Sequence, residues 1–212
     1  CGGGGVSSKN QRKEDSKSDK QVGIEISSEE QGPPPEDAPV GGQFVVGISP
    51  GSLTPDMRNG WAANATNSGF IALMEGYDTV IEKRDRTLDW DPVVVKEHEV
   101  TANDDGSKTY RIVINDNLKW SDGTPITAKD YVFGILMNSS PEYAACEADA
   151  TRGWALVGFN EFNSGEKKEF SGVRLLGDYE FSVTMTAEEL PNYFELSNIS
   201  YSPDPLAAIA PG

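Results

Sequence analysis

The chain has 212 residues, with 34 acidic side chains against 18 basic ones and a formal net charge of −16. This excess of acid excludes a nucleic-acid-binding protein, which needs a basic surface to displace counterions from phosphates. Hydrophobic residues make up 37%, enough for a folded core, but no apolar run approaches the roughly 20 residues of a membrane-spanning helix. Two cysteines are too few for a disulfide-rich scaffold.

The first of these cysteines is residue 1, which is followed by four glycines. A mature chain that starts this way is typical of bacterial lipoproteins, in which the signal peptide has been removed and the Cys1 sulfur carries the lipid. A diacylglyceryl group would hold the protein stably at a membrane, whereas one acyl chain anchors it marginally. The alternative is a chain boundary that happens to fall on a cysteine.

Residues 1–42 are predicted to form a disordered lipoprotein tether. Lys, Glu, Asp, Ser, Gln, Gly and Pro dominate, and such a segment cannot bury enough surface to offset its ordering entropy. The large apolar residues in it are Val6, Val22, Ile24, Ile26 and Val40. An ordinary disordered N-terminus predicts the same flexibility, so Cys1 is what separates the two interpretations. Residues 43–212 are predicted to be the folded part.

The first half of the folded part predicts mainly β-structure. In chain order we expect a strand over 42–48, a loop over 49–59, a helix over 62–75, short strands over 79–82 and 88–90, and a β-rich stretch over 92–101. Residues 108–114 alternate polar and apolar side chains, which is typical of a strand. The turn Asn103-Asp104-Asp105-Gly106 contains Asp-Gly, a strong hairpin signal. The stretches over 92–101 and 108–114 are therefore predicted to pair as a hairpin.

The second half predicts a mixture of helices and strands. After a turn over 118–125, Thr127 is expected to cap a helix, with Asp130 in its first turn and Val132, Phe133, Leu136 and Met137 on its buried face. Further expectations are a short helix over 142–151, a short element over 155–163, a hairpin over 171–176 and 179–186, and one helical turn over 191–196. The apolar ending over 205–212 is interpreted as a chain cut short.

The residues that could carry out chemistry do not combine into a catalytic or metal site. His98 is the single histidine, and in a strand it would point away from Glu97 and Glu99, which disfavours a local metal site. No pair of carboxylates stands out by lying among apolar residues. The chain nevertheless has many carboxylates, so their number alone does not exclude a glycosidase-like pair. Cys146 has no basic neighbour to lower its pKa and is interpreted as a structural, buried cysteine. No cofactor, metal site or catalytic residue is predicted.

Trp61 is a candidate ligand-binding residue because it precedes Asn64 and Asn67 at the start of the predicted helix. An aromatic ring beside side-chain amide groups is typical of a cleft that binds a small molecule. The alternative is a tryptophan that covers the first hairpin.

Several stretches resemble the peptide-type solute-binding proteins of ABC transporters. Residues 41–47 (GGQFVVG) resemble the opening strand of that family. The most specific stretches are DGSKTYRI at 105–112 and LKWSDGTPITAKDYVF at 118–133, which are similar to the family signature DGxxYxFxL … KWSDGxPxTAxDVxF. Residues 157–165 and 171–174 resemble a further segment of oligopeptide-binding members in Gram-positive bacteria. The likeness covers about residues 41–212.

The resemblance implies an α/β fold, with a mixed α+β sheet, as part of the first lobe of a two-lobed clamp that closes around a ligand. Members of the family are longer than this chain, so the second lobe, which carries the acidic group that fixes the ligand's amino terminus, is expected to be absent. The loop from Ser49 and the region of Trp61, Asn64 and Asn67 are the ligand contacts that the chain could offer. The turn at Trp120-Ser121-Asp122-Gly123 is expected to be structural, with Asp122 accepting backbone hydrogen bonds.

These observations lead to the hypothesis of an extracytoplasmic lipoprotein that captures oligopeptides and delivers them to the permease subunits of an ABC transporter. We expect a non-enzymatic monomer on the outer face of the membrane of a Gram-positive-type bacterium, without nucleic-acid partners. The alternatives from other classes are a cell-surface glycoside hydrolase that uses paired carboxylates and an adhesin-type interaction domain.

Overall fold

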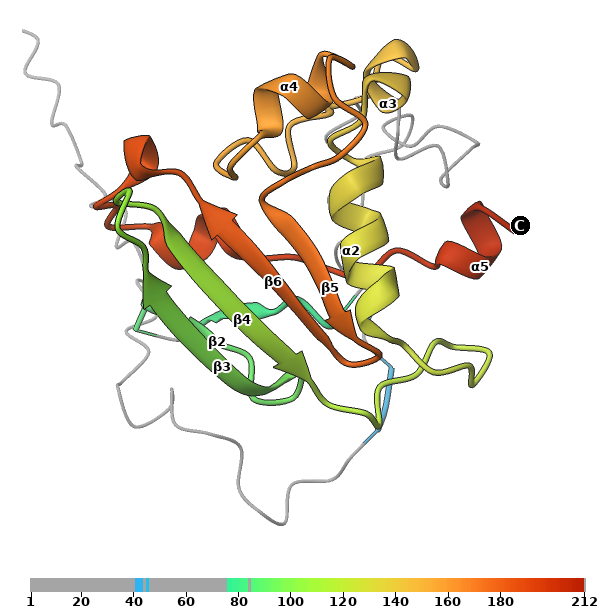
Figure 1. Cartoon of the computed structure of the whole chain (residues 1–212). Coiled ribbons are helices and arrows are strands. Elements are labelled where there is room, and N and C mark those ends of the chain that lie inside the picture. Colours follow the sequence, from blue (N-terminus) through green and yellow to red (C-terminus); the bar gives the residue numbers. More distant parts are fainter. Residues whose placement is uncertain (1–40, 44, 46–75, 84, 212) are drawn as a thin grey trace, which may run out of the picture. The chain divides into compact units, whose positions relative to one another are not determined.

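A computed structural model describes residues 41–43, 45, 76–83 and 85–211 of the chain (Figure 1). The chain divides into two units, Cys1–Gln43 and Phe44–Gly212, and all the elements below belong to the second unit. The expected strand over 42–48 lies largely outside the described residues, and the expected helix over 62–75 lies entirely outside them.

A four-stranded antiparallel sheet forms the centre of the described unit, with the strand order β3-β4-β6-β5. Its strands are β3 (Val95–Ala102), β4 (Lys108–Ile114), β5 (Val173–Gly177) and β6 (Glu180–Met185). Both predicted hairpins are confirmed, because β3 pairs with β4 and β5 pairs with β6. The pairing of β4 with β6 joins the two hairpins into one sheet.

The Asp-Gly turn between β3 and β4 forms as its sequence predicts. The N–H of Gly106 donates to the carbonyl of Asn103 at 3.0 Å, and the Asp105 carboxylate accepts from the N–H of Ser107 at 3.0 Å. Gly106 has a φ of 84°, a left-handed conformation that glycine adopts without a steric cost.

A second, two-stranded sheet consists of β1 (Val80–Glu82) and β2 (Leu88–Trp90), as predicted. The ring of Trp90 stacks on His98 of β3 with a centroid distance of 4.9 Å. His98 is paired with Ile112, while Glu97 and Glu99 are paired with Val113 and Arg111, so the side chain of His98 points to the opposite face from the two glutamates. His98 therefore serves as an exposed packing partner for Trp90.

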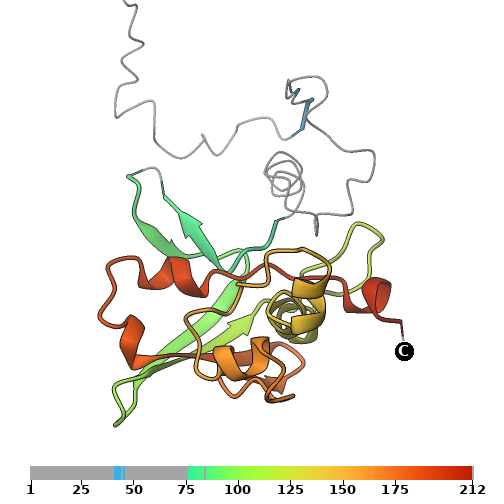
Figure 2. The ribbon, with the colours of Figure 1, turned by 90° about the horizontal axis from the view of Figure 1, so that it is seen from above.

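Helix α2 (Ala128–Met137) packs on the sheet and begins at the predicted cap, Thr127. Figure 2 shows it nearly end-on beside the strands. The ring of Tyr131 stacks on Phe181 of β6 with a centroid distance of 5.6 Å, and Ile135 is buried one turn later. Since residues four apart lie on one face of a helix, Tyr131 and Ile135 define the face that points into the core.

The predicted buried face of this helix is correct only in part, since Val132 and Leu136 pack against the core without being fully buried. Val132, Phe133, Leu136 and Met137 are half-buried, and the buried positions are Ala128, Asp130, Tyr131, Gly134 and Ile135. The physical reason is that apolar residues occur on several sides of this helix, so their periodicity does not select one face. The tertiary contacts of Tyr131 and Gly134 make that selection.

Two predicted helical segments are displaced. The helix expected over 142–151 is α3 (Pro141–Ala145), which ends early because Glu147 takes a left-handed φ of 60°. The turn expected over 191–196 is instead the 3-10 helix η2 (Glu195–Ile199), since the Asn192 side chain first accepts a hydrogen bond from the N–H of Phe194 at 2.8 Å. The remaining short helices are α4 (Phe159–Asn163), η1 (Ala187–Glu189) and α5 (Leu206–Ile209).

The hydrophobic core lies between the sheet and α2, and η2 also contributes to it. The alternating residues of β4 and β6 supply much of it, as period-two strands with one buried face do. The largest fully buried side chains include Tyr110, Ile112, Ile114, Tyr131, Ile135, Phe181, Met185, Ile199 and Tyr201.

The stack of Tyr131 on Phe181 predicts a graded loss of stability. Phe181→Ala should lower the free energy of unfolding by about 3–5 kcal/mol, because it removes a buried ring and leaves a cavity. Tyr131→Phe keeps the stack and removes the hydrogen bond from the Tyr131 hydroxyl to the carbonyl of Tyr77, so it should cost about 1 kcal/mol. Urea unfolding of both variants measures the two losses, and equal losses would contradict the assignment of Phe181 to the core.

Candidate functional site: the groove beside helix α2

The predicted site residues Cys1, Ser49, Trp61, Asn64 and Asn67 all lie outside the described residues. The candidate site is therefore sought among the remaining side chains.

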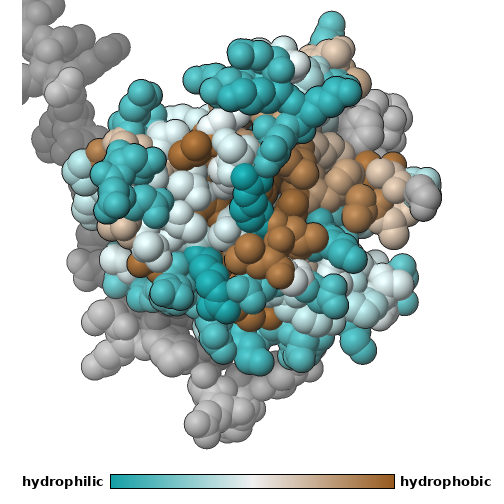
Figure 3. All heavy atoms as spheres, in the orientation of Figure 1, coloured by the Kyte–Doolittle hydropathy of each residue, from teal (hydrophilic) through white to brown (hydrophobic). Residues whose placement is uncertain are grey.

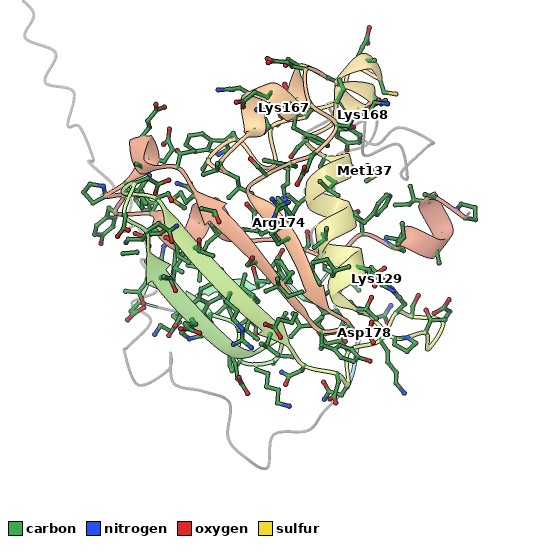
Figure 4. The ribbon with its side chains drawn as sticks, viewed as in Figure 1. Lys129, Met137, Lys167, Lys168, Arg174 and Asp178 are labelled. Carbon is green, nitrogen blue, oxygen red and sulfur yellow. The ribbon has the colours of Figure 1, made fainter. Side chains whose placement is uncertain are left out.

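A groove of about 810 Å³ runs beside the start of α2. One wall comes from the turn and first residues of the helix, and the other comes from α5 and the residues after it. Its lining is Pro125, Thr127, Lys129, Asp130, Leu206, Ala207, Ala210 and Pro211. Figure 4 places Lys129 at the lower end of α2 and Met137 at its upper end. The lining is mainly apolar, with the exposed ammonium group of Lys129 at its edge.

Asp130 is a buried member of this lining, and both of its carboxylate oxygens accept hydrogen bonds. Oδ2 accepts from the N–H of Thr127 at 2.8 Å and from its hydroxyl at 3.2 Å, which closes a capping box at the start of α2. Oδ1 accepts from the N–H of Leu206 at 3.3 Å. One carboxylate therefore caps one helix and holds the first residue of another.

Asp204 holds the same returning segment against α2, at Gly134 and Asn138, one and two turns beyond Asp130. Its Oδ2 accepts from the amide of Asn138 at 2.8 Å, and its backbone N–H donates to the carbonyl of Asp130 at 3.1 Å. A methyl group at Gly134 would lie 2.7 Å from the same Oδ2, so a larger residue there would displace the Asp204 carboxylate. We call Asp130, Gly134, Asn138 and Asp204 the α2 clasp.

The incoming segment of the unit lies beside the outgoing one. The N–H of Thr79 donates to the carbonyl of Tyr201 at 3.0 Å, and the N–H of Tyr201 donates to the hydroxyl of Thr79 at 3.0 Å. That hydroxyl in turn donates to the carbonyl of Ile199 at 3.3 Å. Residues about 120 positions apart are thus joined by three hydrogen bonds, beside the helix that the clasp binds.

The electrostatics of the clasp are set by burial. Burial raises the pKa of Asp204 above its ordinary value of 3.8, and the neighbouring Asp130 carboxylate also raises it. The hydrogen bond from Asn138 and the positive charge of Arg152 act in the opposite direction but do not cancel the shift. The guanidinium of Arg152 is held nearby by a 2.9 Å hydrogen bond to Ser202 and lies 5.8 Å from the ring centroid of Tyr201.

This chemistry suits packing and binding. The carboxylates of Asp130 and Asp204 are oriented by structural donors, so this pair is not set up to donate a proton and activate water as a glycosidase pair does. Among the described residues, no group of three or more His, Cys, Asp or Glu could hold a metal ion. In the same part of the chain, no helix has the length and apolarity needed to cross a bilayer.

Two further sequence interpretations are decided by the structure. Asp122 is a turn residue as predicted, since its carboxylate accepts from the N–H of Thr124 at 2.9 Å and from its hydroxyl at 2.7 Å. The interpretation of Cys146 as buried was wrong, because its thiol is free and exposed. It follows directly on the short helix α3 as its C-cap, outside the core.

An apolar band also crosses the surface near α2 and β5 (Figure 3). Leu175 and Leu176 of β5 are exposed to 44% and 52%. Arg174 on β5 and Asp178 in the turn after it lie beside this band (Figure 4). Since charges of both signs occur here, the band has no single electrostatic preference.

Sequence analysis missed the α2 clasp. Asp130 was singled out for its position in the first helical turn, but Gly134, Asn138 and Asp204 were not singled out. Asn138 and Asp204 are 66 positions apart, so no local spacing connects them.

The raised pKa of Asp204 predicts how the stability of the chain depends on pH. A folded-state pKa above the unfolded value means that the carboxyl contributes stability below about pH 3.8, and that this contribution is lost as the pH rises through the folded-state pKa. Asp204→Asn keeps an oxygen that accepts from the Asn138 amide, and it removes the loss of stability at higher pH because the new side chain does not ionise. It should stabilise the chain more at pH 7 than at pH 4, as measured by urea unfolding, whereas the exposed control Asp116→Asn should not. A gain independent of pH would contradict this account.

Comparison with known proteins places residues 89–210 in a family model described as bacterial extracellular solute-binding proteins, family 5 Middle. The chain is 32% identical over 104 residues to the periplasmic oligopeptide-binding protein OppA of Salmonella typhimurium, covering 48% of this chain and 19% of that protein. It is 36% identical over 101 residues to a dipeptide-binding protein of Lactococcus lactis subsp. cremoris, covering 45% and 17%. The chain thus matches about a fifth of the length of these relatives.

Solved structures share the fold. Haemophilus influenzae OppA in complex with RPPGFSPFR superimposes with a TM-score of 0.55 at 21% identity, covering 71% of this chain and 29% of that chain. Burkholderia pseudomallei OppA gives 0.56 at 16% identity, covering 72% and 29%. The mixed α/β fold is therefore that of part of an OppA-like periplasmic binding protein, as expected. Since the family model covers more than half of the 212 residues, the chain belongs to the bacterial extracellular solute-binding proteins of family 5.

Proposed function

We propose that this chain is part of a solute-binding protein that captures oligopeptides outside the cytoplasmic membrane and delivers them to an ABC permease. The observation that carries the proposal is the family match over 89–210, together with relatives that are named as oligopeptide- and dipeptide-binding proteins. The protein binds its ligand without changing it chemically. The occupied carboxylates of the α2 clasp support this view, since they serve structural roles.

In this proposal residues 76–211 supply the platform, and the ligand contacts come from other residues of the same unit and from a second lobe. The clasp and the pairing of Thr79 with Tyr201 fix the segments that enter and leave the unit. Ser49, Trp61, Asn64 and Asn67 are the proposed ligand contacts of this chain, and a second lobe completes the site. The proposed organisation is a tether over 1–42 and the first lobe over 43–212.

Membrane attachment through Cys1 is a separate part of the proposal. The support is the sequence itself: Cys1 is followed by glycines, and the next forty residues contain few large apolar side chains. A lipid on Cys1 would keep the binding protein, as a monomer, on the outer face of the membrane near its permease.

Peptide binding is testable on the full-length gene product by calorimetry. Titration with a mixed library of short peptides should release or absorb heat with saturation, because the ligand's main chain forms hydrogen bonds in the cleft. Trp61→Ala should weaken the binding, whereas the exposed Trp154→Ala, at 46% exposure in the described unit, should leave it unchanged. No heat with peptides, together with saturable heat from a sugar, would overturn the substrate class.

Lipidation is testable by mass spectrometry of the protein from the membranes of the native bacterium. The N-terminal peptide should carry the mass of a diacylglyceryl group on Cys1, and Cys1→Ser should release the protein from the membrane fraction. Cys146→Ser serves as the matched control because Cys146 is the described free thiol, and it should remain with the membrane. An unmodified Cys1 in the membrane-bound protein would contradict the lipid anchor.

A further inference from the structure

The same kind of turn occurs at three places in the described residues. Each copy has an aspartate at its third position and a serine or threonine at its fifth. The copies are 83–87 between β1 and β2, 103–107 between β3 and β4, and 120–124 before α2. In each copy the N–H of the first residue donates to the carbonyl of the fifth, at 2.8, 2.9 and 2.9 Å. The three stretches therefore share one pattern of backbone hydrogen bonds.

The aspartate carboxylate closes two of these turns in the same way. Oδ1 of Asp105 accepts from the N–H of Ser107 at 3.0 Å and from its hydroxyl at 2.6 Å. Oδ1 of Asp122 accepts from the N–H of Thr124 at 2.9 Å and from its hydroxyl at 2.7 Å. Hydrogen bonds to the ionised form favour it, so the hydroxyl first and the N–H second hold the pKa of both carboxyls below the ordinary value of 3.8.

The glycines that follow these two aspartates are also held by the turn. The N–H of Gly106 donates to the carbonyl of Asn103 at 3.0 Å, and the N–H of Gly123 donates to that of Trp120 at 2.9 Å. Their φ angles are 84° and 87°, in the left-handed region. In an Asp-Gly pair the glycine nitrogen can attack the aspartate side chain spontaneously, because the missing Cβ leaves its approach to Cγ unhindered.

This attack is the first step of aspartate isomerisation. The bond between the glycine nitrogen and Cγ of the neutral carboxyl forms, the bond from Cγ to its hydroxyl breaks, and the hydroxyl leaves with the amide proton as one water molecule. Water then opens the resulting succinimide: addition at the main-chain carbonyl gives isoaspartate, and addition at the side-chain carbonyl restores aspartate. An ionised carboxylate is a poor electrophile, so a group that keeps it ionised and holds its oxygen slows the first step.

We propose that Asp105 and Asp122 are latent isomerisation sites, each kept in its normal linkage by the hydroxyl group of the residue two positions further on. Ser107 and Thr124 hold Oδ1 while the turn occupies the N–H of the glycine. Isomerisation would add one carbon atom to the main chain of the turn and move the flanking residues out of register. At Asp105 it would disturb the pairing of β3 with β4, and at Asp122 the turn that leads to α2.

The third turn provides an internal comparison. Oδ1 of Asp85 accepts from the N–H of Thr87 at 3.0 Å and from its hydroxyl at 2.6 Å, and the N–H of Arg86 donates to the carbonyl of Lys83 at 2.9 Å. Arg86 is left-handed like the two glycines, with a φ of 70°. The hydrogen bonds are the same, but the side chain of Arg86 hinders the attack on Cγ. Asp85 should therefore isomerise slowly with or without the hydroxyl of Thr87.

Isoaspartate at each position can be measured in the full-length gene product by electron-transfer mass spectrometry during long incubation at about pH 6. Ser107→Ala and Thr124→Val should each raise the isomerisation rate about tenfold at the preceding aspartate, because each variant loses one hydrogen bond to a charged oxygen. Ser107→Thr keeps a hydroxyl and should keep the original rate at Asp105. Thr87→Val is the matched control, and the rate at Asp85 should not change.

The pH dependence of the rate separates protection by the hydroxyl from a general loosening of the turn. Loss of the Ser107 hydroxyl raises the pKa of Asp105 toward its ordinary value, so the neutral carboxyl persists to higher pH. The acid side of the rate profile should therefore move to higher pH in Ser107→Ala. A rate that rises by one factor at every pH, without this movement, would contradict the role of the hydroxyl.

The unfolded protein supplies a test that needs no variant and holds even if a variant fails to fold. In concentrated urea the turns are absent, and isoaspartate should form faster at Asp105 and Asp122 than in the folded protein. Equal rates in the folded and unfolded protein would overturn the inference, and so would the absence of isoaspartate at both sites in urea. Unchanged rates in Ser107→Ala and Thr124→Val, with both variants folded, would overturn it as well.

Discussion

The buried carboxylate of Asp130 stabilises two parts of this unit at once, the start of α2 and the start of α5. One oxygen closes the capping box that starts α2, and the other holds the backbone of Leu206 where α5 begins. A buried carboxylate is tolerated only when its oxygens are hydrogen-bonded, so the helix start and the returning segment must both be in place. Helix α2 then presents Tyr131 to Phe181, and the sheet is covered on the side of the core.

The sequence was most informative where the signal was local. The Asp-Gly turn at Gly106, the cap at Thr127 and the turn at Asp122 each depend on side chains within four positions, and all three formed as predicted. The buried face of α2 was predicted only in part because apolar residues occur on several of its sides. The stack of Tyr131 on Phe181 orients the helix on the sheet, and the contact of Asp204 with Asn138 adds a second constraint; both join residues far apart in the chain.

The same limit applies to the candidate site. The signature around Trp120-Ser121-Asp122-Gly123 indicated the family, and those residues form a turn. Cys146 is exposed because α3 ends directly before it. The helix ends there because Glu147 takes a left-handed conformation, which the sequence pattern does not indicate.

The hydrogen-bonded pairing of Thr79 with Tyr201 has a consequence for the origin of such a unit. The segment from Thr79 to Tyr201 starts and ends at one place, so it can be inserted into a surface loop of another protein without stretching the host. The sheet and α2 lie within this segment, and the α2 clasp adds Asp204 shortly beyond it. A binding protein can acquire a module of this kind in a single recombination event and afterwards modify its outer surface independently of its ligand cleft.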